Sequence, residues 1–428
     1  MAKLTIDLSL LKKNPDFRNL WLSSFISFLG SMITYVAVPF QIKQLTHSYM
    51  AVGLVGAIEL VPLIVFGLYG GVLADAMDRK KLIWTTEASA LVLTTILVIN
   101  SLQSKPHLVL IYVVTGFFAA VDGLQRPSAN AILPRLVGHA DLPAASAIMG
   151  LRSQFGAVVG PAIGGIIIAS FTVTVGYTAD AITFVLSLFF LWKVKAVPPR
   201  DSAEKPSLAG LKEGLRYSVS RKDLLGTYLI DLAAMFFAIP VALIPFWADY
   251  LGAPWALGLL YAAGTVGALV VVLTSGWVPK YKFHGRAIIL AAIGWGIAIT
   301  CAGLVRSLPL VLLFLALAGA SDEVSALFRS TIWNQTIPDE LRGRLAGIEL
   351  LSYSIGPIAG QLRAASIASV TSLSFSVVSG GITCVIAVVL LAFFLPQLRR
   401  YNVETNEYAI RERKNRKLEK LEKLEKLE

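Results

Sequence analysis

The sequence contains few of the residues from which disulfide frameworks and metal sites are built. Its two cysteines, Cys301 and Cys384, both lie inside apolar runs, so we expect neither a disulfide framework nor a cysteine metal site. The four histidines stand at the ends of apolar runs without metal-ligand spacing; they are His47, His107, His139 and His284. We therefore predict no metal site and no cofactor.

The motifs of several function classes are also missing. A pump driven by ATP would need G-x-x-x-x-G-K-[ST] and a soluble nucleotide domain, and the sequence has neither. An enzyme would need clustered carboxylates, histidines or a nucleophile with its base, and no loop contains such a set, so we predict no enzymatic activity. A channel, a receptor and a scaffold remain alternatives, although paired repeats with glycine-broken helices favour alternating-access transport.

Charged residues are scarce, at 15% of the chain, and they lie mostly between long apolar runs. This placement explains the net charge of +11 without a nucleic-acid partner. Hydrophobic residues make up 56% of the 428 positions, and the mean hydropathy is +0.69. The composition is that of a protein embedded in a lipid bilayer.

The apolar runs are long enough to cross a bilayer, which takes about 20 residues per helix. About twelve such runs are present. They cover roughly residues 18–42, 50–75, 82–101, 107–130, 144–169, 175–194, 224–249, 255–279, 287–305, 308–332, 345–369 and 374–395. We predict an all-α integral membrane protein with about twelve transmembrane helices in two pseudo-symmetric six-helix halves.

Lysine and arginine are distributed unevenly among the loops. With the N-terminus in the cytoplasm, the outer loops retain only Lys43, Lys105 and Arg306, and the other clusters lie inside. The positive-inside rule then predicts a multi-pass protein of the inner membrane with both termini in the cytoplasm. Residues 1–19 are polar and do not resemble a cleaved signal peptide.

A hydrophilic segment divides the predicted spans six and six. We expect an N-terminal half over 1–194, a cytoplasmic linker over 195–223, a C-terminal half over 224–395 and a basic low-complexity tail over 396–428. Four apolar residues of the linker have the spacing of an amphipathic helix: Leu208, Leu211, Leu215 and Val219. The "KLE" repeats of the tail have a period of three, which does not favour a coiled coil.

The fourth and tenth spans indicate that the two halves are related. Residues 119–134 and 319–338 each contain an Asp, then an Arg, then a Pro near the predicted inner end of the span. The spacings differ by a few residues, so this similarity supports a repeat only in combination with the matching loop positions.

The loop after the second span carries "GGVLADAMDRKK", residues 70–81. A plain positive-inside loop is one interpretation, but Gly71, Asp75, Arg79 and Lys80 have a spacing that charge alone does not require. The segment resembles the loop signature of the major facilitator superfamily, with departures at Ala76, where a basic residue is usual, and at Asp78, where a glycine is usual. The resemblance implies a monomeric secondary transporter that moves a small-molecule substrate by rocking around a mid-membrane cavity.

The fifth span contains "GAVVGPAIGG", residues 156–165. Its glycines recur on one face, where another helix can approach closely, and the proline bends the span; these residues are Gly156, Gly160, Pro161, Gly164 and Gly165. We interpret the segment as a packing seam between the halves, with a glycine zipper unrelated to transport direction as the alternative. It resembles the signature of drug and proton antiporters in the same superfamily, and this resemblance implies export.

The N-terminal stretches 8–30 and 36–56 resemble the siderophore-exporter branch of that superfamily, with a leucine-rich start, "FIS", "VAVP" and "THS". The resemblance implies export of an amphipathic small molecule, a siderophore of the enterobactin type, coupled to protons. Efflux of drugs or antibiotics is the alternative.

Ionised side chains within spans cost about 2.5–3.5 kcal/mol on insertion scales, so they usually face a cavity or a partner. The candidates for proton coupling are Glu59, Asp122, Asp231, Asp322 and Glu323. The candidates for an ion pair or gate are Arg126, Arg152, Arg329 and Arg363. Asp122 and Arg126 are four residues apart and can pair, in a gate or in a purely structural bridge. Glu59 is the most isolated, about 24 Å along its helix from Asp75, and is therefore a candidate to bind a proton.

Overall fold

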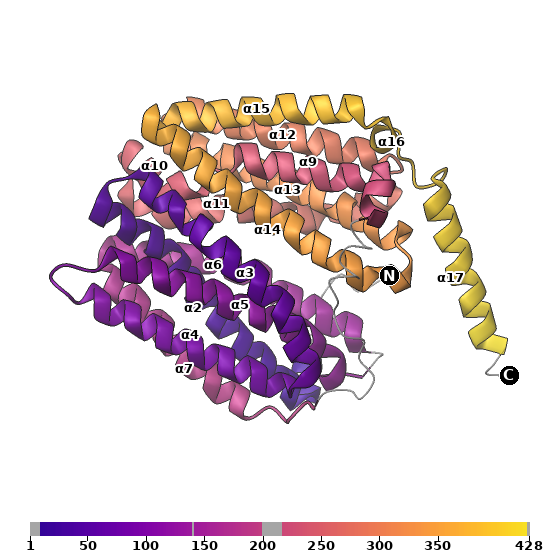
Figure 1. Cartoon of the computed structure of the whole chain (residues 1–428), viewed down its shortest axis with the longest axis horizontal. Helices are drawn as coiled ribbons and strands as arrows, with labels where there is room; N and C mark the ends of the chain where they lie inside the picture. The colour runs from indigo at the N-terminus through magenta and orange to yellow at the C-terminus, as the bar shows by residue number, and fades with distance from the viewer. Residues whose placement is uncertain (1–8, 139–140, 199–215, 426–428) are drawn as a thin grey trace. The chain divides into compact units, whose positions relative to one another are not determined.

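The computed structural model describes residues 9–138, 141–198 and 216–425, and helices form most of this part of the chain (Figure 1). The long helices of the first half are α2 (Pro15–Thr46), α3 (Tyr49–Ala76), α4 (Arg79–Ser101), α5 (Leu108–Leu136), α6 (Leu142–Ser170) and α7 (Val173–Trp192). Those of the second half are α9 (Lys222–Ala238), α11 (Leu257–Thr274), α12 (His284–Leu304), α13 (Leu308–Thr336), α14 (Asp339–Val370) and α15 (Leu373–Phe394), and the seven-residue α10 (Ile244–Tyr250) follows α9. Short elements complete the chain: α1 (Ser9–Lys13), η2 (Val241–Leu243), η3 (Pro254–Ala256), η4 (Ser275–Lys280), α16 (Pro396–Arg399) and α17 (Glu407–Glu425).

Eleven segments within the described residues are long and apolar enough to cross a membrane. They correspond to eleven of the predicted spans, and α14 occupies the place of the remaining one. α14 has a lower mean hydropathy than the other spans, because it starts with "DELRGR" and also carries Gln361 and Arg363 inside the span. The prediction of an all-α membrane protein with about twelve helices is therefore confirmed.

Polar residues at the helix starts account for several boundaries. Asn14 accepts a hydrogen bond from the backbone N–H of Phe17 at 3.0 Å, and Pro15 occupies the first turn of α2. Side chains cap four other long helices in the same way: Ser48, Asp78, Thr172 and Ser372. These short polar residues satisfy N–H groups that have no partner within the helix.

The chain divides into two compact units, and the division is not the linear one expected from the sequence. The first unit comprises 1–206 and 241–265, and the second comprises 207–240 and 266–428. Residues 241–265 join the first unit through contacts such as the ion pair of Lys43 with Asp249. Lys43 also donates to the carbonyl of Pro245 at 2.9 Å. The six-plus-six division remains our proposal for the parts that move during transport.

The predicted amphipathic helix of the linker falls largely on 199–215, outside the described residues. Only its last part, residues 216–220, is described, and it is helical.

The segment after the last span packs against the second unit, although the sequence predicts a low-complexity tail there. Leu398 is fully buried against Gly226 and Gly285. The ring of Tyr401 stacks on His284 with centroids 5.9 Å apart, and Val403 donates to the carbonyl of Lys282 at 3.1 Å. Residues 396–403 thus cross the ends of α9 and α12.

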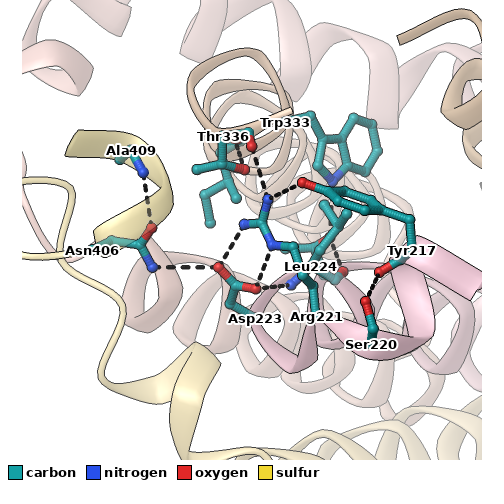
Figure 2. Close-up of polar contacts among 11 residues, drawn as sticks. Tyr217, Ser220, Arg221, Asp223, Leu224, Trp333, Thr336, Asn406 and Ala409 are labelled. Atoms are coloured by element: carbon teal, nitrogen blue, oxygen red, sulfur yellow. Dashed lines mark hydrogen bonds and ion pairs between the residues drawn. The ribbon is translucent and has the colours of Figure 1, made fainter. Parts of the chain in front are cut away.

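A buried arginine anchors the start of α17 to the same unit (Figure 2). Arg221 makes a paired interaction with Asp223, at 3.2 and 2.8 Å, and donates to the carbonyl of Thr336 at 2.8 Å. Asn406 donates to Asp223 at 3.3 Å, and the ring of Tyr408 lies 3.8 Å from the guanidinium. Burial alone would lower the pKa of Arg221, but the hydrogen bond and charge of Asp223 raise it above its ordinary value. Arg221 is therefore a permanent charge that ties α9, α13 and α17 together.

Candidate transport site

The loop between α3 and α4 is held by its own cations and by one acid. Arg79 is buried, and its backbone N–H donates to the carbonyl of Val197 at 3.1 Å. Lys80 donates to the carbonyl of Trp192 at 3.1 Å. The contacts of Gly71 and Asp75, the other two signature positions, lie outside the described ones. The described contacts join the loop to the end of α7.

Asp78 stands where the superfamily signature has a glycine, and it has two partners. Its carboxylate caps α4 by accepting from the N–H of Lys81 at 3.1 Å. The second oxygen accepts from the N–H of Val197 at 2.9 Å. This departure from the signature therefore fixes the loop in a different way from a glycine turn.

The glycines of α6 form a close helix contact, mostly within one half of the sequence. A Cβ atom on Gly156, Gly160 or Gly164 would meet residues of α2. Only Gly165 differs, because its Cβ would overlap the backbone of Gly258 in α11. The face is thus a packing seam, but α2 of the same half, rather than the other half, supplies most of its partners.

Glu87 of α4 is the centre of a buried polar network in the first unit, and the sequence analysis did not include it among the candidates. Its carboxylate is 4% exposed and accepts from Gln125 and Ser187 at 2.7 Å each and from Ser27 at 3.3 Å. These neutral donors come from α5, α7 and α2. Glu87 is the sole charge between residues 82 and 101, and this isolation was the signal in the sequence.

Asp180 of α7 is the centre of a second buried polar network, about two helical turns before Ser187. It is fully buried and accepts from the hydroxyls of Thr34, Thr183 and Thr94. Its donors are again neutral hydroxyl groups on α2, α4 and α7 itself. The core of the first unit therefore holds two acids by hydrogen bonds from uncharged groups.

Arg152 of α6 lies beside this network. Its guanidinium stands 5.3 Å from the ring of Phe28, and it interacts electrostatically with Glu87. Within the part of the chain that the structure describes, its Nε is buried and has no hydrogen-bond partner. Arg152 is thus brought to an acid other than the coupling candidates.

The structure pairs Asp122 with Arg126 on α5, as their spacing predicts. Two guanidinium nitrogens lie 2.8 and 2.7 Å from one carboxylate oxygen, and both side chains are about half exposed. Glu59 of α3 is mostly buried and interacts electrostatically with Asp122. Among the described residues we find no hydrogen bond or ion pair of the Glu59 carboxylate. Within the described residues it is thus an acid beside another acid, with no cation in ion-pair contact.

The second unit holds a different arrangement, in which the acids have a cation. Arg329 of α13 forms a buried ion pair with Asp231 of α9 and lies 3.8 Å from Asp322. Glu323, the next residue, is partly buried and interacts electrostatically with Asp322 and Arg329. Three of the predicted acids therefore cluster around the guanidinium of a fourth predicted site residue, Arg329.

Arg363 of α14 donates a hydrogen bond to the backbone of the seventh span, where its helix is interrupted. α9 ends at Ala238, and Pro240 has no N–H with which to continue the helical hydrogen bond to the carbonyl of Phe236. The Nε of Arg363 donates to that carbonyl at 3.1 Å. Arg363 thus stabilises a discontinuous span, and it does not join the cluster of charged residues around Arg329.

Comparisons with known proteins identify the family. The family model described as transmembrane secretion effector matches residues 8–420. The enterobactin exporter EntS of Escherichia coli O1:K1 is 32% identical over 401 residues, which cover 92% of this chain and 95% of that protein. EntS of Escherichia coli O81 shows the same identity and coverage. The chain belongs to the transmembrane secretion effectors of the major facilitator superfamily.

Solved structures support the fold of this transporter. A transporter of the POT family has a TM-score of 0.71 at 12% identity, covering 91% of this chain and 99% of that one. The nucleoside transporter NupG has a TM-score of 0.67 at 12% identity, covering 90% and 99%. At such low identity these similarities concern the fold alone. They confirm the all-α transporter fold that the sequence predicts.

Proposed function

We propose that this transporter exports a siderophore of the enterobactin type from the cytoplasm across the inner membrane, in exchange for protons. The observation that carries the proposal is the 32% identity to the enterobactin exporter, which extends over 92% of the chain and is not confined to one motif. Both termini then lie in the cytoplasm, as the loop charges predict. The monomer is the proposed functional unit.

The distribution of acids supports proton coupling. The chain has no motif for nucleotide binding, so uphill export needs an ion gradient. An acid inside a span that has no cation bound to it can take up a proton without breaking an ion pair. Glu59 fits this description, whereas Asp231 and Asp322 share Arg329. We propose Glu59 as the coupling residue, with Asp122, Asp231, Asp322 and Glu323 as the other candidates.

The pair of Asp122 and Arg126 supplies a way to link cargo to the proton. Half of each side chain is exposed, so cargo can reach the pair, and Asp122 acts electrostatically on Glu59. If cargo donates hydrogen bonds to Asp122 and so compensates its negative charge, Glu59 holds a proton less tightly, and cargo binding favours proton release, as exchange requires. Cargo and proton would thereby influence each other through two neighbouring helices, α3 and α5.

A secretion assay tests the cargo. The chain is produced in Escherichia coli cells that lack their own enterobactin exporter, and enterobactin in the medium is measured under iron limitation. We expect secretion to rise at least about tenfold over cells with an empty vector. A tenfold rise corresponds to a transport barrier that is lower by about 1.4 kcal/mol. Membrane-inserted protein without a rise in secretion would contradict the cargo assignment. Resistance to amphipathic antibiotics in the same cells would instead favour the drug-efflux alternative.

A further inference from the structure

The second unit has an apolar groove that neither the acids nor the glycine seam account for. Its volume is about 600 Å³, and it lies between the end of α11, η4, α12 and α13. This volume is within the range of ligand-sized pockets. The residues that line it along its length include Trp277, Tyr281, Leu290, Ile297, Phe314 and Leu317. No charged side chain is among the residues that line it.

The groove opens on the surface that faces the bilayer. Leu290 is 64% exposed and Ile297 is 51% exposed, although both are large apolar residues in the middle of a span. Because large apolar side chains are unfavourable in a water-filled cavity, we assign this exposed face to the lipid tails. The groove therefore accepts its occupant from within the membrane.

Close helix contacts hold the walls of the groove. A Cβ atom on Gly267 of α11 would overlap the carbonyl of Ala316 in α13. A Cβ atom on Gly294 of α12 would lie 3.0 Å from the hydroxyl oxygen of Ser321 in α13. Because small residues fix these crossings, α11 cannot easily close onto α12, and the groove persists as a preformed site.

Cations stand at one end of the groove. Lys280, Lys282 and Arg286 are exposed and flank Tyr281 and Ala287, which line the groove. Lys282 pairs with Glu404 at 2.8 Å. Within the described part of the chain, no acid lies within ion-pair distance of Lys280 or Arg286. Trp277 and Tyr281 are aromatic residues of the kind that gather at the level of the headgroups.

We propose that this groove binds an anionic phospholipid, with an acyl chain along α12 and the headgroup phosphate on Lys280 and Arg286. The apolar lining recognises the chain, and the two cations recognise the negative headgroup. A zwitterionic lipid would fill the same groove but would gain less from the cations. The proposal is independent of the cargo, because every residue in it lies in the groove or among residues 280–286, between the end of η4 and the first turn of α12.

Fluorescence quenching by brominated lipids tests the proposal, since Trp277 lines the groove and is 42% exposed. The full chain is reconstituted in bilayers that contain brominated phosphatidylglycerol or brominated phosphatidylcholine at equal mole fraction. The signal of Trp277 is the difference between the parent and Trp277→Phe. We expect brominated phosphatidylglycerol to quench Trp277 at a mole fraction at least about fivefold lower than brominated phosphatidylcholine needs for the same quenching. This difference is the effect of one cation near a headgroup.

Two variants locate the preference. Lys280→Gln with Arg286→Gln should remove the difference between the two lipids while Trp277 is still quenched. Lys12→Gln with Lys13→Gln removes the same charge from another exposed pair and should leave the preference intact. Trp255, which is 60% exposed outside the groove, should show no preference for either lipid. Equal quenching of Trp277 by both lipids in the parent, or a preference that survives the loss of both cations, would overturn the proposal.

Discussion

Replacement of Gly165 by Leu is expected to abolish export, with a loss of at least about 100-fold. A side chain at this position meets the backbone of Gly258, which has no rotamer to change. Overpacking of about 3 kcal/mol corresponds to that loss if it falls on one state of the cycle. Gly160→Leu meets the side chain of Met32 instead, so we expect a smaller loss there.

The matched control is Gly150→Leu on the same helix. No atom lies within 4 Å of a Cβ at Gly150, so this variant should export normally. Export in proteoliposomes is measured after equal amounts of folded protein have been confirmed by size-exclusion chromatography. Normal export by Gly165→Leu would contradict the close-contact interpretation of the seam, and so would equal losses in Gly150→Leu and Gly165→Leu.

Replacement of Glu59 by Gln is expected to abolish uphill export while downhill exchange continues. The amide has nearly the shape of the acid but cannot carry a proton, so cargo movement is uncoupled from the pH gradient. Flux of cargo and internal pH are read together in proteoliposomes under an imposed gradient. Glu404→Gln, which removes an exposed acid outside the spans, is the control and should behave as the parent.

Two further variants separate the coupling residue from its surroundings. Asp122→Asn should weaken the response to cargo because it removes the charge that acts on Glu59. Glu87→Gln keeps one oxygen that can accept from Gln125, and its NH2 group can donate to the hydroxyl oxygen of Ser187, so we expect coupling to persist. If Glu59→Gln still concentrates cargo as the parent does, the proposed coupling residue is wrong, and Asp231, Asp322 and Glu323 become the next candidates.

The number and approximate limits of the spans could be predicted because hydropathy is a local property. Each span in a bilayer must satisfy its own backbone N–H and C=O groups by helical hydrogen bonds. Its length and apolar composition can therefore be recognised from a continuous stretch of sequence. α14 shows the limit of this rule, since its charged start and the polar residues Gln361 and Arg363 make it less apolar than its neighbours while it still forms a helix of full length. The capping residues Asn14 and Asp78 likewise act over three positions only.

The polar core could not be predicted in the same way because its partners are distant in the sequence. Gln125, Ser187 and Ser27 reach Glu87 from three other helices, and no spacing rule joins them. The role of Arg363 depends on a carbonyl 127 positions away that Pro240 leaves without a donor. The packing of Tyr401 on His284 could not be predicted either, because the two residues are far apart in the sequence. The low-complexity repeats that follow also gave no indication of tertiary contacts in this segment.

The most direct test of proton-driven siderophore export uses the parent protein in proteoliposomes with an acidic interior. Enterobactin is supplied outside, at the surface that corresponds to the cytoplasm for molecules of inverted orientation. Its accumulation and the internal pH are followed together. The account predicts that enterobactin accumulates above its external concentration, that the interior becomes less acidic as it does so, and that a protonophore abolishes both changes. Enterobactin that equilibrates to the same level with and without the pH gradient, in protein that transports it, would contradict proton-coupled export.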